Sequence, residues 1–307
     1  MLDWSNKWPP PRGIHRPDGR RRPSVLTPAG FVGAVLCLEP APGRAEPWTL
    51  RNPAPRAHLR SLSTDRPDKT ETPFTVDAGH VQVELDVFRY EHDRAMAGDV
   101  EQIREEWSVG PVLAKLGISH NFDFELGSEP YLEIREVARA NGETRETLRQ
   151  GFGHVTLRAK LNLRGNDDGR SALALLPFVQ LPTTQDGLGR DVVEAGLAVP
   201  LSLTLTDRLE LGAQTGMQWM GDAEGCGHHF ELVNSITLGI DLSSRFSGYV
   251  EFWVLLDPDE ADDWEGTFDF GLNFLVNDHL KLDAGLNVGV TETAPDWNPF
   301  LGLSWRR

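Results

Sequence analysis

Charged side chains alternate with apolar ones along much of the chain, and their types suit the passage of ions or solutes better than covalent chemistry. Fixed charges of both signs create a field across a confined passage, and an excess of carboxylates favours cations. The alternative is that these charges are solvated, keep the interior wet and pair across strands. The candidate lining residues are Glu84, Asp86, Asp123, Glu125, Glu194, Glu210, Glu231, Glu251, Asp269 and Asp283, with Lys115, Arg158, Lys160 and Lys281.

Other residues of catalytic or metal-binding type occur in patterns too sparse for either chemistry. Cys226, His228 and His229 have no second pair at ligand spacing nearby, whereas a structural zinc site has four ligands. The acidic run 257–263 lacks the Gly and the terminal Glu of an EF-hand loop. The pair Ser119–His120 stands outside any Gly-x-Ser-x-Gly elbow. We therefore expect no metal site, no cofactor and no enzymatic activity.

Composition excludes several classes of protein. The 307 residues carry a formal net charge of -16 at pH 7, which argues against a nucleic-acid partner. No apolar run reaches the roughly 18 residues of a membrane-spanning helix. Two cysteines, Cys37 and Cys226, cannot build a disulfide framework.

The first 46 residues have the order of a secretory signal. Three arginines, Arg20 to Arg22, precede an apolar run at 25–38, and small residues follow up to Ala45. The alternative is a short buried helix. We expect residues 1–46 to be a leader cleaved near Ala45, residues 47–78 a linker and N-terminal periplasmic or plug segment, and residues 79–307 the folded body.

The folded body alternates with a period of two residues, which predicts strands with one apolar and one polar face. Gly110–Pro111 interrupts the second strand, and the apolar phase shifts there, as it does at a β-bulge. The predicted strands are about 80–92, 104–119, 121–136, 152–164, 171–183, 191–204, 207–220, 228–240, 245–256, 264–275, 279–290 and 298–306.

An even number of strands, joined alternately by short turns and longer loops, is typical of an outer-membrane barrel. The longer loops are expected near 93–103, 137–151, 184–190, 221–227, 257–263 and 291–297. A closed barrel is also the only sheet that leaves no unpaired backbone in lipid. We therefore predict an all-β, antiparallel, up-and-down transmembrane barrel of about twelve strands. The alternative is a soluble sandwich or lipocalin-like barrel, whose apolar face points inward.

The barrel prediction fixes which side chains face lipid. Leu157, Leu211, Phe270 and Leu282 should lie on the outer wall. Their neighbours Arg158, Glu210, Asp269 and Lys281 should then face the lumen, because successive side chains of a strand point to opposite faces.

The segment before the first strand carries a distinctive motif, Thr64-Asp65-Arg66-Pro67-Asp68, followed by Phe74. One interpretation is a plug in the barrel mouth, with Arg66 paired to lumen carboxylates such as Glu84. The other is a turn that leads into the first strand and caps the first hairpin. Pro67 and Pro73 exclude a regular central strand.

The stretch 63–80, with this motif, resembles the start of bacterial proteins of the MetA-pathway of phenol degradation family, and 151–161 and 175–183 are similar to its central strands. The resemblance covers residues 62–307. It implies an outer-membrane barrel linked to the uptake of small, often aromatic compounds. At the end of the chain, Arg306 and Arg307 follow Trp305, which departs from the usual barrel terminus.

Two functions of different classes follow. The first is an outer-membrane channel for passive uptake of small solutes, for which the resemblance implies small aromatic compounds. The second is a structural or adhesive barrel with a filled, non-conducting interior. In both, the expected surroundings are lipid, lipopolysaccharide and the barrel assembly machinery, after export by the leader, and a channel adds a small-molecule solute.

Overall fold

The computed structural model describes residues 48–167, 169–185, 187–222, 227–258 and 264–307. The predicted leader and Cys226 lie outside the described residues. In this part of the chain, no helix is both long and apolar enough to cross a membrane.

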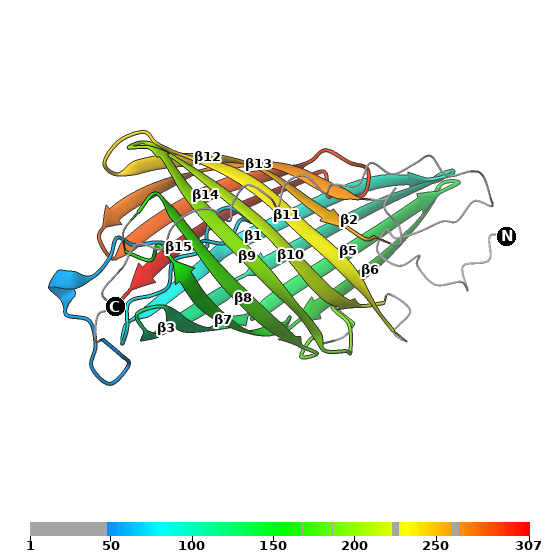
Figure 1. Cartoon of the computed structure of the whole chain (residues 1–307). Helices are drawn as coiled ribbons and strands as arrows, with labels where there is room; N and C mark the ends of the chain where they lie inside the picture. The colour runs from blue at the N-terminus through cyan, green and yellow to red at the C-terminus, as the bar shows by residue number, and fades with distance from the viewer. Residues whose placement is uncertain (1–47, 168, 186, 223–226, 259–263) are drawn as a thin grey trace.

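The described residues form a single antiparallel sheet that closes on itself, because the last strand pairs with the first. The strands are β1 (Val81–Ala97), β2 (Val100–Val109), β3 (Val112–Ser119), β4 (Phe122–Ser128), β5 (Tyr131–Ala140), β6 (Glu143–Gly151), β7 (Val155–Arg164), β8 (Ser171–Leu181), β9 (Glu194–Thr206), β10 (Leu209–Gly221), β11 (His228–Asp241), β12 (Phe246–Leu256), β13 (Glu265–Asn277), β14 (Leu280–Gly289) and β15 (Trp297–Arg306). Short breaks separate β2 from β3, β4 from β5 and β6 from β7. The result is a closed barrel of twelve strands, which confirms the predicted fold (Figure 1).

The break between β2 and β3 lies at the predicted interruption. Gly110 has a φ of 76°, a conformation that glycine adopts without steric cost. The amide of Gly110 donates to the carbonyl of Asp86, whose own amide donates to the carbonyl of Pro111. As a result β1 pairs with β2 beyond this point and with β3 before it.

Two of the predicted long loops are wrong. Residues 93–103 and 137–151 belong to strands β1, β2, β5 and β6, which extend beyond the rest of the wall and turn tightly at Gly98 and at Asn141–Gly142 (Figure 1). Asn-Gly is the preferred pair for a two-residue hairpin turn. This extension is highly charged. There, hydrogen bonds from Arg94 and Arg139 hold the pKa of Glu101 below its usual range.

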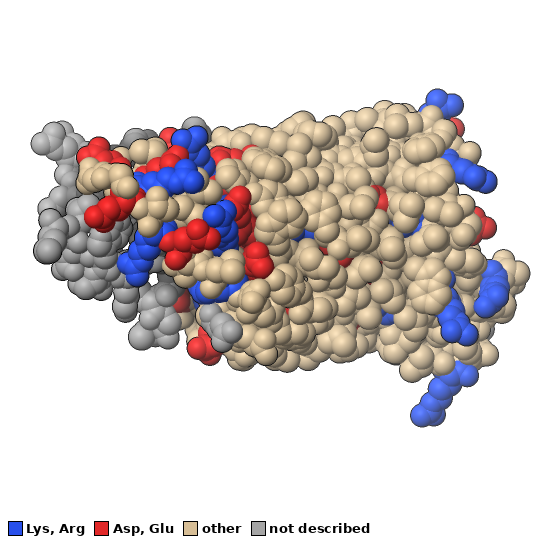
Figure 2. Space-filling model, turned by 180° about the vertical axis from the view of Figure 1, so that it is seen from behind, with Lys and Arg blue, Asp and Glu red and all other residues tan. Residues whose placement is uncertain are grey.

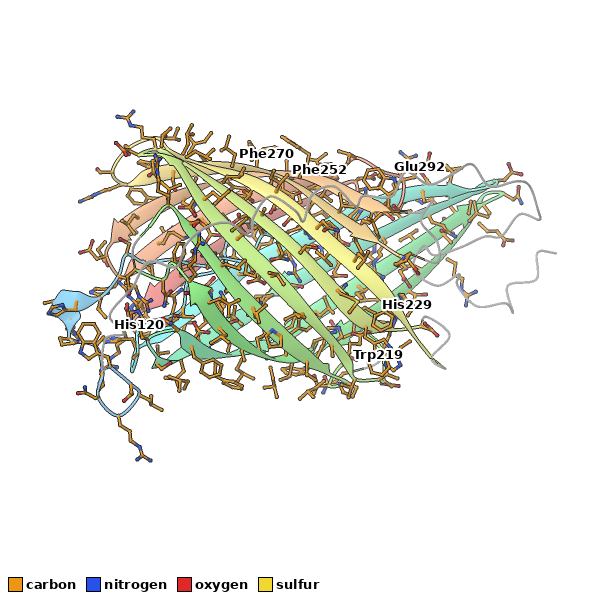
Figure 3. The ribbon with its side chains drawn as sticks, viewed as in Figure 1. His120, Trp219, His229, Phe252, Phe270 and Glu292 are labelled. Carbon is orange, nitrogen blue, oxygen red and sulfur yellow. The ribbon has the colours of Figure 1, made fainter. Side chains whose placement is uncertain are left out.

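The apolar face of the strands points outward, as predicted. Leu157, Phe270 and Leu282 are 37%, 41% and 40% exposed, whereas Asp269 is fully buried. Figure 3 shows Phe252 and Phe270 on the outer wall, and Figure 2 shows few charges over the middle of the cylinder, with clusters at both ends. The lipocalin-like alternative, in which the apolar face points inward, is therefore wrong.

The two ends of the barrel differ. Short turns, the C-terminus and the described N-terminal residues, including the 3-10 helix Arg56–His58, lie at one end, which we name the turn end (Figure 1). His120 marks it in Figure 3. Strands β8, β10, β12 and β14 end at the opposite end, named the loop end, where the extension also lies.

Candidate functional site

Residues 60–78, named the lumen segment, lie inside the barrel and contact strands around its circumference. Asp65 binds side chains of β3 and β7, Arg66 binds those of β1 and β14, and Lys69 binds those of β13. The segment leads back to the turn end, where β1 begins. Its charged side chains thus pair with charges on the inner wall.

Asp65 is surrounded by three cations of one wall, named the basic cluster: Lys115 of β3 and Arg158 and Lys160 of β7. Lys160 Nζ lies 2.6 Å from Asp65 Oδ1, and Arg158 Nη2 lies 3.4 Å from Oδ2, to which Lys115 also binds. Lys115 and Lys160 are 2% and 0% exposed. Buried ions are tolerated only when they are paired, so Asp65 is part of what keeps these lysines buried.

Strand register explains why these cations meet. Glu125 of β4 is the cross-strand partner of both Lys115 and Arg158, and Asp123 is the partner of Lys160. Arg158 Nε lies 2.7 Å from Glu125 Oε2, while Lys160 Nζ lies 3.5 Å from Oε1. Wall carboxylates therefore hold the cations in place, and Asp65 accepts the shorter bond from Lys160.

Arg66 occupies an acidic position on another wall. Gly302 of β15 is the cross-strand partner of both Asp86 and Asp283, so the three residues form a row across β1, β15 and β14. The guanidinium of Arg66 binds both aspartates, with Nη2 2.7 Å from Asp283 Oδ1. A Cβ at position 302 would overlap this guanidinium. The missing side chain of Gly302 therefore makes the space that Arg66 fills.

A third group of contacts fixes residues 69–70. The backbone amides of Lys69 and Thr70 each donate to Glu251 at 2.8 Å, and Lys69 Nζ lies 3.7 Å from Asp269 Oδ2. The Lys69 ammonium also lies 4.3 Å from the centre of the Trp253 ring, a cation–π contact. Two facing carboxylates of β12 and β13 are thus matched by one cation and two amides.

The lumen segment is also anchored where it enters and leaves the barrel. Arg60 Nε lies 2.8 Å from Asp77 Oδ1, and Arg306 Nη1 lies 3.2 Å from Asp77 Oδ2. Val76 donates its amide to Asp123 at 2.8 Å. Arg306, which departs from the usual barrel terminus, is therefore an inward residue that holds this anchor, while Trp305 faces outward.

The remaining predicted residues spread along the barrel. Glu210 accepts a bond from Ser202, and Lys281 Nζ donates to the Arg66 carbonyl at 2.9 Å. Near the loop end, Glu194 accepts from Gln180, and Glu231 accepts from Gln218. Phe74 is half-buried beside the buried Pro73.

The candidate metal residues have other partners. His228 stacks on Trp219 at 3.9 Å between ring centres, and His229 lies 2.9 Å from Asp222. Both lie near the loop end, where Figure 3 labels Trp219 and His229. No group of three or more potential metal ligands occurs among the residues that the structure describes.

Two cavities border the lumen segment. The first, about 360 Å³, lies toward the turn end against β9 to β14, and the second, about 290 Å³, lies toward the loop end against β1 and β13 to β15. Their only shared lining residues are Arg66, Pro67 and Asp68, named the tip of the segment. The tip therefore separates the two cavities.

Gly302, Asp77 and Arg306 are parts of this site that the sequence does not predict, because each acts through a partner that only barrel closure brings near. The motif at residues 64–68, in contrast, stands out in the sequence. Arg66, Pro67 and Asp68 form the tip. Asp65 pairs with the basic cluster, and Arg66 pairs with Asp86 and Asp283.

An outward apolar wall, a closed antiparallel sheet and a charged interior together define an outer-membrane β-barrel of the channel-like type. Within this class, the chain belongs to the family "Putative MetA-pathway of phenol degradation", which matches residues 64–307. The predicted family is thus confirmed.

Several solved structures are similar to the chain at low identity. The transport unit of the autotransporter AIDA-I from Escherichia coli superposes with a TM-score of 0.53 and 13% identity, over 81% of this chain and 94% of that one. The NanC porin gives 0.45 and 10%, over 73% and 98%. The "CymD monoaromatic hydrocarbon channel" gives 0.43 and 7%, over 74% and 87%. No curated protein matches the chain.

Proposed function

We propose that this protein is a channel of the bacterial outer membrane for small solutes, in which the lumen segment is a movable plug. The observation that carries the proposal is the pair of cavities separated by the tip at residues 66–68. Displacing the tip would join them into one passage. Short turns then face the periplasm and longer loops the exterior, as in other such barrels.

The contacts of the segment favour a plug over a permanent filling. Ion pairs and hydrogen bonds hold it, through Asp65, Arg66, Lys69 and Thr70. Such groups exchange partners with water and ions more readily than a close-packed apolar core separates. A structural barrel with a filled interior is the second candidate, and the burial of Lys115 and Lys160 against the segment favours it.

The family supplies the proposed solute class, small compounds that include aromatic ones, because its description refers to phenol degradation. The proposed surroundings are outer-membrane lipid and lipopolysaccharide, reached by leader-directed export and by the barrel assembly machinery. We assign no enzymatic activity to the chain and no nucleic-acid partner.

Conductance in planar bilayers tests the plug. The mature chain should conduct weakly or intermittently, and a chain without residues 47–72 should conduct steadily, because the deletion removes the tip and the partners of the basic cluster. A chain that is folded yet fails to conduct with and without these residues would favour the structural barrel. Equal steady conductance from both chains would contradict the plug.

A further inference from the structure

We propose that the basic cluster, Lys115, Arg158 and Lys160, is a binding site for the carboxylate of an anionic solute, and that Asp65 occupies this site while the segment is in place. The inference rests on the proposed channel and names a substrate class for it, small monocarboxylates. Asp65 is then an internal substitute for the ligand.

The geometry around Asp65 is that of a bound carboxylate. Each of its two oxygens accepts from a lysine, Oδ1 from Lys160 and Oδ2 from Lys115, and Arg158 lies 3.4 Å from Oδ2. The amide of Thr72 also donates to Oδ1 at 3.0 Å. Three of these four donors belong to residues other than the segment's own, so they stay when the segment leaves.

The wall alone does not provide these cations with equivalent partners. Lys115 also pairs with Glu84, and Arg158 with Glu125, but Lys160 is 3.5 Å from Glu125 against 2.6 Å from Asp65. The anchor at Val76 and Asp77 stays in place when the tip moves, so Asp123, the cross-strand partner of Lys160, keeps its bond from the Val76 amide. Once Asp65 leaves with the tip, Lys160 lacks a close acceptor, and leaving a charge without its partner is costly. An incoming carboxylate restores that partner.

The position of the cluster suits a solute on its way through the lumen. Lys115 and Lys160 are buried behind Asp65, so the site becomes accessible only when the segment moves. Entry of the solute and displacement of the segment are therefore competing events at one site. The second cavity, toward the loop end, is lined by Arg66, Lys69 and Arg89 as well as by carboxylates. These cations can bind an anion before it reaches the basic cluster.

Benzoate binding to the full-length mature chain in detergent tests the assignment, with benzamide as the uncharged probe of the same shape. Asp65→Asn removes the carboxylate that bridges Lys115 and Lys160 while keeping the size of the side chain, and Glu71 of the segment, 2.5 Å from Arg158, stays in place. We expect benzoate to bind about tenfold more tightly to this variant than to the unsubstituted chain, since a charge-assisted bond is no longer made internally. Benzamide binding should not change, and adding Lys160→Met should abolish the gain.

Glu210→Gln is the matched control, because it also neutralises one inward carboxylate, on β10, away from the basic cluster and from the ion pairs that hold the segment. It should leave benzoate affinity unchanged. An equal gain from Glu210→Gln, a gain that survives Lys160→Met, or equal benzoate affinity in the unsubstituted chain and Asp65→Asn would each overturn the site. Heat-dependent electrophoretic mobility checks that every variant is a folded barrel.

Conductance measured on the same samples separates this inference from the proposed function. A benzoate gain in Asp65→Asn without conductance in any sample would contradict the channel and keep the carboxylate site. Conductance without a benzoate gain would contradict the carboxylate site and keep the channel.

Discussion

Gly302 sets the position of Arg66 by lacking a side chain. The residue lies between Asp86 and Asp283 across three strands, and a Cβ there would overlap the Arg66 guanidinium. A glycine in a strand interior often marks a site where another group approaches closely, and here that group is a cation of the lumen segment. Alternation predicts that position 302 faces inward, but the need for glycine arises only from closure of the barrel.

Gly302→Leu should therefore displace Arg66 and release the tip. We expect more frequent open-channel events in planar bilayers. The free energy of unfolding should fall by about 1 kcal/mol, because the adjacent cavities accommodate the shifted side chain. Arg66→Gln should have a similar effect on conductance, and combining the two substitutions should add little. An additive increase would show that Gly302 acts independently of Arg66.

At the scale of strands, the alternation of side chains correctly predicts which residues of the barrel wall face inward and outward. It does not lead to the strands of the extension, where loops are predicted. Inward and outward positions follow directly from a period of two, which is why the lumen carboxylates and the lipid-facing leucines could be named. The loops predicted at 93–103 and 137–151 are wrong, because these charged residues continue the strands β1, β2, β5 and β6. Asn141–Gly142 was the available signal for a hairpin there.

Because the outward face of each strand contacts lipid, an arginine should destabilise the barrel more at an outward position than at an inward position of the same strand. Phe270, in the middle of β13, is an outward residue, whereas Asn273 on the same strand borders the larger cavity. Phe270→Arg should cost about 2–4 kcal/mol in refolding into lipid vesicles, because a cation then faces the hydrocarbon core. Leu211→Arg should cost less, since Leu211 lies two residues from the turn between β9 and β10.

Asn273→Arg is the control for Phe270→Arg, because the new cation meets a water-accessible lumen. Urea titration of vesicle-refolded protein gives all three free energies. If the cost of Asn273→Arg equalled that of Phe270→Arg, the apolar face would not be the lipid face.

At the scale of the whole molecule, the sequence predicts that Arg66 pairs with lumen carboxylates such as Glu84 but not the partners found, since Glu84 accepts from the Arg66 backbone amide while the guanidinium binds Asp86 and Asp283. Arg66 meets Asp283, and Lys69 meets Asp269, only because the sheet closes and the segment turns back inside it. The alternation along a strand predicts whether a side chain points inward, but it does not predict which residue lies across the lumen from it. The motif at residues 64–68 nevertheless indicated that some charged partner was needed, since it places both signs next to each other between prolines.

The balance of inward charge predicts the selectivity of the open passage. The wall residues named from the sequence comprise ten carboxylates and four bases, and fixed negative charge raises the local cation concentration in a confined channel. Deleting residues 47–72 removes the cations Arg66 and Lys69 from the lumen together with the carboxylates Asp65, Asp68 and Glu71, so the carboxylate excess of the wall itself sets the charge of the open passage. We expect the reversal potential under a KCl gradient to show potassium preference in the deleted chain.

Glu251→Gln combined with Asp269→Asn should weaken that preference, because these facing carboxylates lose the Lys69 partner in the deleted chain and become its least compensated charges. Glu231→Gln, near the loop end, is the matched control and should change the reversal potential less. Raising the KCl concentration should reduce every difference, since screening shortens the reach of fixed charge to about 3 Å at 1 M salt. Chloride preference in the deleted chain would contradict the lumen charge balance, and a preference that persists unchanged in the double variant would place its origin elsewhere in the wall.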